Sequence, residues 1–372
     1  MFIVYFMAGT LYAQSTILVG PGHKTKTLAS AAARAVDGDT FEVEAGDYRG
    51  DVAVWDKKNI TVRAIGGRVR LLASGMAAEG KGIWVLRGGG MTVQGIDFMG
   101  TRVPDKNGAG IRLESGKLTV LDCSFTDNEN GILTSNNPIV ELDISDSEFG
   151  HNGHGDGQSH NLYVGEIAHL TVTGSYFHHA NVGHLIKSRA ALNHILYNRL
   201  TDEIGGRASY ELELATGGIA YVIGNIIGQS SQTENPHVIS YGAEGYKWPK
   251  NELFLVNNTL IDDRPQGGIF LRIRPGNVSA KAVNNLLVGR GKLDTAGPGD
   301  YRNNFTVDWD VFERAARQDY RLKLGATILG RAVDAGSANG QPLLPMREYN
   351  HPRNTRSLAV AVRNPGALQS SP

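Results

Sequence analysis

Short apolar stretches recur along most of the chain, and each of them ends on a bulky apolar residue. Within many stretches apolar and polar side chains alternate, which is typical of β-strands with one buried face. The stretches end at Phe98, Phe125, Phe149, Phe177, Leu200, Ile227, Leu260 and Leu287. Successive end points are 27, 24, 28, 23, 27, 33 and 27 residues apart. A period in the twenties built from strand-length segments predicts a parallel β-solenoid in which each repeat forms one coil.

Four later repeats carry an asparagine two residues before the terminal apolar residue. These asparagines are Asn198, Asn225, Asn258 and Asn285. Asparagine tolerates turn geometry, and its side chain can bond to the same residue one coil away. We therefore expect an inward-facing asparagine ladder at a turn. Leucine-rich repeats have a similar period, but they need a dense leucine consensus, usually with outer helices, and neither is present in the sequence.

A second apolar column lies between these stretches. Its members are Ile111, Ile132, Leu162, Leu185, Leu212, Val238 and Ile269. If they point inward, their neighbours point outward, because side chains alternate along a strand. One outward column is then Gly110, Gly131, Asn161, His184, Glu211, His237 and Gly268, and a second holds Tyr163, Ile186, Glu213, Ile239 and Phe270. Lys187 falls on the inward parity, so we expect the strand to end at Ile186 and Lys187 to open a turn.

The two ends of the repeat region differ from its middle. Residues 27–36 read as a short Ala-rich amphipathic helix, followed by Gly38-Asp39-Thr40 and an alternating strand. This order resembles the N-terminal cap of right-handed parallel β-helix proteins, where it covers the open end of a stacked core. We expect residues 14–305 to form the β-helix with this cap, and residues 306–372 to form a C-terminal capping segment with an irregular tail.

The repeat and the cap together resemble the pectate-lyase-like superfamily over nearly the whole chain. The resemblance implies an all-β fold, a single-stranded right-handed parallel β-helix with a short N-terminal capping helix. The superfamily contains lyases, hydrolases, epimerases and non-enzymes, so membership alone implies no single reaction. The reaction has to be inferred from the site.

Composition excludes several classes of partner. The chain has 37 basic and 37 acidic residues, so no net field attracts nucleic acid or an anionic membrane. Cys123 is the single cysteine, which excludes an intrachain disulfide and favours a small buried residue on a strand. Residues 1–13 form a short apolar run that resembles a secretory signal, so we expect a secreted or periplasmic protein. No later stretch approaches the roughly 18 apolar residues of a membrane span.

Titratable and metal-ligating residues are concentrated between Gly155 and Gly218. Three polar clusters there occupy matching places in three successive repeats. They contain His160, Asn161, Tyr163, His184, Lys187, Arg189, Arg207, Glu211 and Glu213, and His237, Tyr241 and Glu244 follow one repeat later. If the repeats stack, Asn161, His184 and Glu211 share one wall. We expect a site there that acts on a polysaccharide.

The cluster is similar to the calcium-dependent lyases that include chondroitinase B and the related alginate lyases. In that group an Asn on one coil and a Glu-x-Glu on a neighbouring coil bind calcium, while a Lys and an Arg act as base and acid. The resemblance implies Asn161, Glu211 and Glu213 as Ca²⁺ ligands, with Lys187 and Arg207 as the catalytic pair. The order departs from the group, because Lys187 precedes the Glu-x-Glu instead of following it.

Elimination across a uronic acid needs a neutralised carboxylate, a base for the C5 proton and an acid for the departing O4. Lys187 could be the base if cations such as His184 and Arg189 lower its pKa. Tyr163 or His184 could instead abstract or deliver a proton. Arg189 or Arg207 could bind the substrate carboxylate in a bidentate ion pair. The residues expected to contact substrate are His160, His237, Tyr241 and Glu244.

Other interpretations of the same residues stay open. Glu211 and Glu213, about 7 Å apart on one extended strand, could be the two carboxylates of a glycoside hydrolase. A C5-epimerase would share most of the groups of a lyase. The glutamates could also form a solvated outer face or pair with Lys187 and Arg207. A further alternative is a non-catalytic β-helix that binds glycan or supports the export of a surface polymer. The excess of Lys, Arg and His over Asp in the cleft favours a lyase acting on an acidic polysaccharide. We expect the protein to be a monomer.

Overall fold

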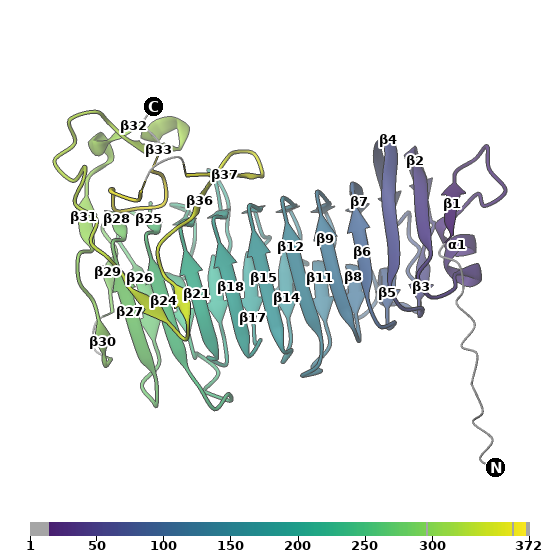
Figure 1. The fold of residues 1–372 in the computed structure, drawn as a ribbon, viewed down its shortest axis with the longest axis horizontal. Coiled ribbons are helices and arrows are strands. Elements are labelled where there is room, and N and C mark those ends of the chain that lie inside the picture. Colours follow the sequence, from purple (N-terminus) through teal and green to yellow (C-terminus); the bar gives the residue numbers. More distant parts are fainter. Residues whose placement is uncertain (1–14, 295–296, 359–360, 370–372) are drawn as a thin grey trace, which may run out of the picture.

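A computed structural model describes residues 15–294, 297–358 and 361–369 of the chain. These residues form one elongated parallel β-solenoid of about ten turns, drawn with its long axis horizontal in Figure 1. Each coil contributes strands to three stacks, which we call the first, second and third faces. The predicted parallel β-helix is confirmed. The leader expected over residues 1–13 lies outside the described residues.

The first face is a ten-stranded parallel sheet. Its strands are β3 (Ala53–Trp55), β5 (Gly82–Leu86), β8 (Ala109–Leu113), β11 (Asn130–Thr134), β14 (Leu162–Val164), β17 (Ile186–Ser188), β20 (Leu212–Leu214), β23 (His237–Tyr241), β26 (Ile269–Ile273) and β29 (Lys292–Leu293). Because the coils succeed one another along the axis, each strand pairs with the strand one coil away.

The second face begins with β1 (Thr16–Val19). It continues through β2 (Thr40–Arg49), β4 (Ile60–Leu72), β6 (Met91–Gln94), β9 (Lys117–Leu121), β12 (Glu141–Ser145), β15 (His169–Thr173), β18 (Leu192–Leu196), β21 (Ile219–Ile223), β24 (Glu252–Val256), β27 (Ser279–Val283) and β30 (Gly299–Asp300). The long strand β4 pairs with both β6 and β7, so it runs on into the third face.

The third face follows the second after a tight turn. It contains β7 (Ile96–Met99), β10 (Ser124–Thr126), β13 (Glu148–Gly150), β16 (Tyr176–His178), β19 (Arg199–Thr201), β22 (Ile226–Gln229), β25 (Thr259–Asp262), β28 (Leu286–Gly289) and β31 (Phe305–Val307). The eight apolar residues that end the sequence repeats lie here and pair in register from coil to coil.

A column of aromatic rings fills the core behind the third face. Phe98, Phe125, Phe149 and Phe177 stack with ring centroids 4.9, 4.6 and 4.5 Å apart and have no exposed surface. Buried stacked rings remove large apolar areas from water and add a favourable pairing geometry. The repeat in the sequence is thus the repeat of this column.

The predicted asparagine ladder is confirmed at the turn between the second and third faces. The backbone N–H of Asn198 donates to Asn225 Oδ1 at 2.8 Å, and Asn225 and Asn258 donate in the same way to the next coil at 2.9 Å. A second ladder, which the sequence did not reveal, lies between the third and first faces. There the backbone N–H of Asn128 donates to Asn152 Oδ1 at 3.0 Å, and that of Asn152 to Asn161 Oδ1 at 3.3 Å.

The N-terminal helix is confirmed as α1 (Leu28–Arg34), two residues shorter than predicted at its C-terminal end. Thr27 caps it by accepting the Ser30 N–H, and Asp51 accepts the N–H groups of Leu28 and Ala29. These acceptors satisfy N–H groups that a helix start leaves free. Leu28, Ala31 and Ala32 are buried, so α1 covers the end of the core, at the right of Figure 1.

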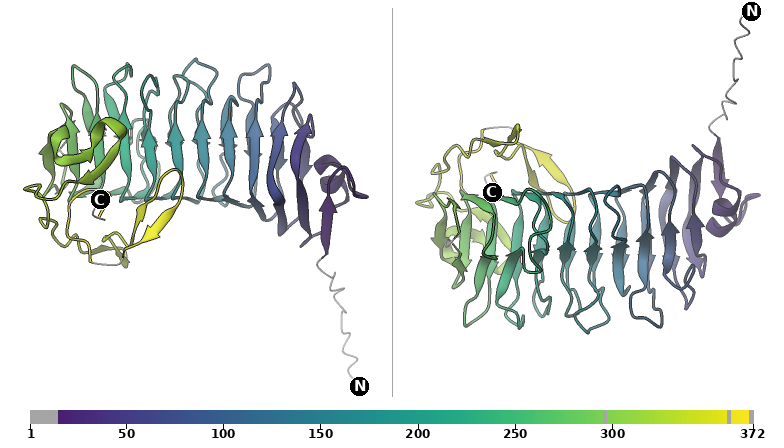
Figure 2. Two further views of the ribbon diagram at one scale, coloured as in Figure 1. Left: turned by 90° about the horizontal axis from the view of Figure 1, so that it is seen from above. Right: turned by 90° about the horizontal axis from the view of Figure 1, so that it is seen from below.

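After β31 the chain forms short elements and then returns along the outside of the solenoid, as Figure 2 shows. These elements are η1 (Trp309–Val311), β32 (Phe312–Arg314), η2 (Ala315–Arg317), β33 (Asp319–Leu322), β34 (Ser337–Ala338), β35 (Gln341–Pro342), β36 (Arg347–Tyr349) and β37 (Thr355–Ser357). The returning segment reaches back to the β9–β10 turn, where Arg353 pairs with Asp122 at 3.2 Å. It also accepts a hydrogen bond from Asn284 at the β27–β28 turn through Val333 O.

Two smaller expectations can be placed on this fold. Cys123 is fully buried and reduced, and burial raises the pKa of its thiol to about 12, so it is an inert core residue. Among the described residues, no helix has the length and apolar character needed to cross a membrane.

Candidate functional site

The outward residues of β14, β17 and β20 form the centre of the candidate site. Tyr163 pairs with Lys187 and Lys187 with Glu213 in adjacent strands, so the three side chains lie side by side on the first face. The inward residue of β17 is Ile186, which pairs with Leu162 and Leu212. Leu185, predicted as the inward residue of this column, is fully buried in the core, but it precedes β17, so the predicted register is wrong by one residue here. Lys187 lies within the strand and faces outward, which corrects the prediction that it opens a turn.

The predicted column is also wrong two and three coils further on, by one residue at β23 and by two residues at β26. Ile239 pairs with Leu212, and Leu271 pairs with Ile239, in place of the predicted Val238 and Ile269. The outward row consequently extends to Ser240 and Arg272 beyond Glu213. In the opposite direction it runs through Leu133 to Arg112. Arg112 and Arg272, which the sequence argument missed, place a cation towards each end of the central cluster.

A row of rings runs along one edge of this cluster. His160, His184, Tyr210 and His237 come from four successive coils, with neighbouring centroids 4.4, 4.9 and 6.0 Å apart. The backbone N–H of His184 donates to His160 Nδ1 at 3.0 Å, which fixes the remaining hydrogen of neutral His160 on Nε2. The predicted wall of Asn161, His184 and Glu211 is wrong, because His184 aligns with His160 and Tyr210.

Four charged side chains form one network beside the rings. Lys187 Nζ lies 3.0 Å from Glu213 Oε2 and 3.0 Å from Glu244 Oε1. Arg189 donates a hydrogen bond to each carboxylate oxygen of Glu244, both at 2.7 Å. Its guanidinium group also lies over the Tyr163 ring, 5.1 Å from the ring centroid. The Lys187, Arg189 and Glu213 side chains are only 14, 15 and 5% exposed, so this network is screened weakly by water.

The ion pairs in this network shift the pKa values of its members and so determine which of them can accept a proton. Burial alone would lower the pKa of Lys187, but Glu213 and Glu244 outweigh it and raise that pKa. The prediction that neighbouring cations lower the pKa of Lys187 is therefore wrong. Burial would raise the pKa of Glu244, yet Arg189 and Lys187 bring it down to about 2. Lys187 therefore stays protonated at neutral pH, because Glu213 and Glu244 stabilise its charge, and it is a poor base.

His184 is the group in the cluster best suited to take a proton. Burial lowers its pKa, and Glu213 only partly offsets this effect, so the ring is neutral at pH 7. Its Nδ1 lies 3.2 Å from Glu213 Oε2, although not in line for a hydrogen bond. When Glu213 accepts the hydrogen of Nδ1, the lone pair of Nε2 is available as a base.

The three residues implied as calcium ligands do not form one donor set. Asn161 has no exposed surface, and its Oδ1 accepts from Asn152 in the second ladder. Glu211 is fully buried, and Glu213 lies between Lys187 and His184. The residues therefore do not fit a shared calcium ion in this arrangement. Calcium binding by the protein stays a prediction.

Two further candidates lie away from the cluster. Tyr241 is fully buried and points inward in register with Leu214, and its hydroxyl donates to Gly218 O. It belongs to the core, which corrects its assignment to substrate contact. Arg207 donates to Asn181 Oδ1 at 3.1 Å in the loop before β20. The structure thus brings together His160, Tyr163, His184, Lys187, Arg189, Glu213 and Glu244, and places His237 at the end of the ring row.

Glu211 lies in an acidic interior behind the first face. Both of its carboxylate oxygens lack a hydrogen-bond partner. Burial raises the pKa of Glu211 well above its ordinary value, and repulsion from Asp202 and Asp262 adds to the shift. Burial likewise raises the pKa of Asp202 to about 8. A pair of catalytic carboxylates at Glu211 and Glu213 is therefore excluded by position, since one residue is inside the solenoid and the other outside.

We expect Glu211→Gln to stabilise the protein increasingly as the pH rises. A carboxyl whose pKa is raised by folding contributes its full stability below its unfolded pKa and loses it as pH rises through the folded pKa. The amide does not titrate, so wild type and variant should be similar near pH 4, and the variant should have the higher thermal midpoint by about pH 8. Parallel midpoint curves over this range would show that Glu211 does not titrate with a raised pKa.

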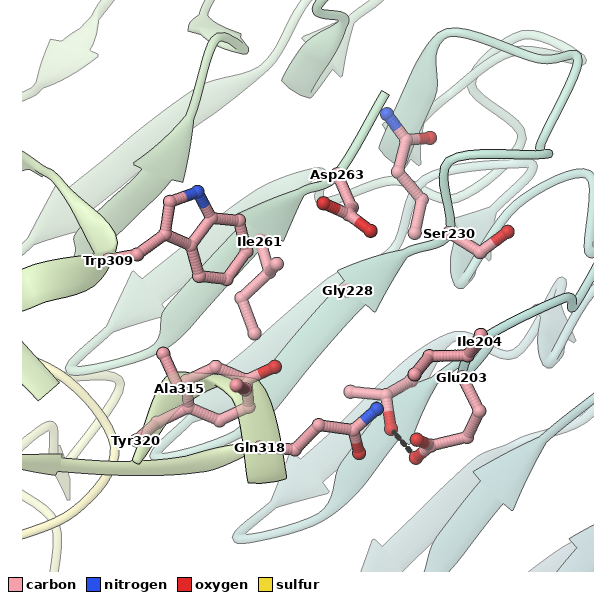
Figure 3. A pocket seen from close by; sticks show the side chains of 13 residues that line it. Glu203, Ile204, Gly228, Ser230, Ile261, Asp263, Trp309, Ala315, Gln318 and Tyr320 are labelled. Atoms are coloured by element: carbon pink, nitrogen blue, oxygen red, sulfur yellow. Dashed lines mark hydrogen bonds between the residues drawn. The ribbon is translucent and has the colours of Figure 1, made fainter. Parts of the chain in front are cut away.

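A cavity of about 330 Å³ lies elsewhere, between the outer side of the third face and the C-terminal turns. Figure 3 shows Trp309, Ile261 and Tyr320 along it, with Glu203, Ser230 and Asp263 as polar neighbours. None of the predicted site residues lines it. The candidate site on the first face is therefore a separate surface.

Fold and site together define a parallel β-solenoid with a charged, histidine-containing cluster on one face. No protein-family model matches the chain, and no curated protein sequence matches it. Among solved structures, the chain is similar to a family PL6 polysaccharide lyase from Pseudopedobacter saltans. The match has 14% identity and a TM-score of 0.38, and it covers 78% of this chain and 93% of that one. A similarity at this level carries no information about the reaction.

Proposed function

We propose that this protein is a polysaccharide lyase that cleaves an acidic, uronic-acid-containing glycan by β-elimination on its first face. One observation carries the proposal. Arg189 and Lys187 together hold a carboxylate, that of Glu244, beside the neutral ring of His184. A substrate carboxylate that replaced Glu244 would be neutralised by the same two cations, with a base within the same cluster.

The outward row supports a polymer as the substrate. From Arg112 to Arg272 it spans seven strands, which corresponds to about 29 Å at the usual strand spacing. A single sugar would occupy only a small part of this length. Cations at Arg112, Lys187 and Arg272 along the row suit a chain that carries repeated negative charges. A secreted or periplasmic location, which we also propose, would bring such polymers to the protein.

In the proposed reaction, Arg189 and Lys187 stabilise the negative charge that develops on the substrate carboxylate. His184 Nε2 takes the C5 proton, and the electron pair of that C–H bond forms the C4–C5 double bond. The C4–O4 bond breaks, and the departing oxygen takes a proton from the hydroxyl of Tyr163. Exchange with water then returns a proton from His184 to Tyr163. No step uses a metal ion.

The alternatives have less support on this face. A retaining or inverting hydrolase needs one carboxyl that is protonated near neutral pH. Burial would raise the pKa values of the outward carboxyls Glu213 and Glu244, but both are lowered, by His184 and Lys187 at Glu213 and by Arg189 and Lys187 at Glu244. A C5-epimerase would use the same base and cations, so it is distinguished by its product alone.

The test is to incubate the protein with a panel of uronate polymers and measure ultraviolet absorbance together with reducing ends. A lyase should produce the absorbance of an unsaturated uronate in step with chain shortening. New reducing ends without absorbance would indicate a hydrolase, and deuterium from solvent at C5 without shortening an epimerase. Binding without any of these changes would contradict the proposal and indicate a glycan-binding protein.

A matched pair of lysines tests the binding half of the proposal. Lys117 on the second face also pairs with two carboxylates, Glu141 and Asp143, at 3.2 and 2.7 Å. Lys187→Ala should raise KM for the acidic glycan, because it removes a cation that holds the substrate carboxylate. Lys117→Ala should leave KM unchanged. Equal effects of the two substitutions would place the binding surface elsewhere.

A further inference from the structure

Three histidines meet at the turn that follows β13 and β16 on the third face. His151 follows β13, His178 ends β16 and His179 follows it. One ring nitrogen from each lies within 4.8 Å of the others, and among the described His, Cys, Asp and Glu residues no other group of three does so. The Nδ1 atoms of His178 and His179 are 2.8 Å apart.

The stacking of the coils creates this cluster. Gly150 pairs with His178 in the β13–β16 register, so His151 and His179 occupy equivalent positions one coil apart. Both have left-handed backbone angles, with φ of 56° and 44°, and their rings stack at 4.7 Å. The His178 ring packs directly on Gly150, where any Cβ atom would overlap it. Local sequence and register therefore bring the three rings together.

The surroundings resemble those of a metal site. Glu148 Oε1 lies 3.3 Å from His178 Nε2, on the side of the ring away from the Nδ1 that faces His179. A carboxylate on the distal nitrogen commonly orients a ligating imidazole. Two Nδ1 atoms this close need either one shared hydrogen or a bound ion between them. The described residues give the His151 ring no hydrogen-bond partner.

We propose that His151, His178 and His179 bind one divalent transition-metal ion of the Zn²⁺ type, with Glu148 supporting His178. Imidazole nitrogens are the preferred ligands of such ions, and three of them leave a fourth position for water or a further ligand. Ligands about 2.0–2.1 Å from zinc in a tetrahedron lie about 3.3 Å apart, so only small ring rotations are needed. His151 is exposed, which gives the ion a path from solvent.

The ion would join two successive coils at one turn. His151 belongs to the β13 coil, and His178 and His179 belong to the β16 coil. Binding to the folded state alone raises stability by mass action. The site lies on the third face and is independent of the proposed lyase activity, whose groups are on the first face.

The test uses the full chain without a histidine tag, after treatment with a chelator. Calorimetric titration with Zn²⁺ should give one equivalent, Co²⁺ should give the visible absorbance of a bound ion, and Zn²⁺ should raise the thermal midpoint. His151→Asn should weaken Zn²⁺ binding at least about tenfold, and Glu148→Gln should weaken it by roughly tenfold. Asparagine suits position 151 because it tolerates a positive φ.

A second histidine pair provides the matched control. His169 and His194 lie on the second face with ring nitrogens 2.8 Å apart, but they belong to no group of three. His169→Asn should leave Zn²⁺ binding and its effect on the thermal midpoint unchanged. The proposal is overturned if the wild-type chain binds no Zn²⁺, or if His151→Asn and His179→Asn both bind it as the wild type does. These readouts need no glycan, so they are unaffected if the proposed lyase activity is absent.

Discussion

Replacing His184 with alanine should lower turnover of an acidic glycan by roughly two to four orders of magnitude, the usual contribution of a positioned acid or base. The ring is the neutral proton acceptor in a cluster whose other strong groups are already paired. Its removal leaves Lys187 and Arg189 able to hold the substrate, so kcat should fall far more than KM rises. Steady-state kinetics on the polymer identified by the panel would measure both.

The pH profile gives an independent check on the same residue. Because burial lowers the pKa of His184, its basic form should persist below the ordinary histidine value of 6.5. The acid limb of kcat/KM for the wild type should therefore lie below about pH 6.5. The variant should lose this limb along with its activity.

His194 supplies the control for this substitution. It is a partly buried histidine on β18, in the same coil as His184, but it lies on the second face against Tyr221. His194→Ala should retain wild-type turnover. If His184→Ala keeps full activity with its fold intact, the base is another group. If neither the wild type nor the variants turn over any uronate polymer, a binding function is indicated.

Truncating Phe149 to alanine should have the largest effect on stability, about 3–5 kcal/mol. Its ring lies between Phe125 and Phe177 in the core column, with no exposed surface. The substitution loses two stacked contacts and leaves a cavity that rigid neighbouring coils cannot close. Phe149→Leu retains much of the volume and should cost markedly less.

Denaturant unfolding of the wild type and the two variants would test this order. Both substitutions leave every outward side chain of the first face in place, so glycan turnover at low temperature should be retained. A loss below about 1 kcal/mol for Phe149→Ala would mean that the column is not closely packed.

The fold could be read from the sequence because one strong signal repeats. The first four terminal residues of the repeat are all phenylalanines, 27, 24 and 28 residues apart, so one register stacks all four rings. The ladder asparagines are equally unambiguous at Asn198, Asn225, Asn258 and Asn285. The second ladder was missed because Asn128, Asn152 and Asn161 have unequal spacings, set by loops of different lengths.

The first face was harder because its strands contain adjacent apolar residues. In Leu185-Ile186 and in Val238-Ile239, either residue of the pair could be the one that points inward. The turn before each strand varies in length, so the position of the inward residue cannot be counted from the turn. A shift of one residue exchanges the inner and outer sets. On the predicted register Lys187 has an inward position, which is why a turn is expected there, and Glu211 falls in the outward column. Tyr210 and the flanking arginines were missed for the same reason.

The returning C-terminal segment changes how the solenoid can come apart. A stack whose coils touch only their neighbours can fray from an open end, one coil after another. Here residues after β31 contact Asn284 near the last coils and Asp122 near the middle of the solenoid. Opening the terminal coils therefore also breaks contacts that the interior coils make. The stretch from β9 to β28 should therefore behave as one cooperative unit, and the cluster at Lys187 lies within it.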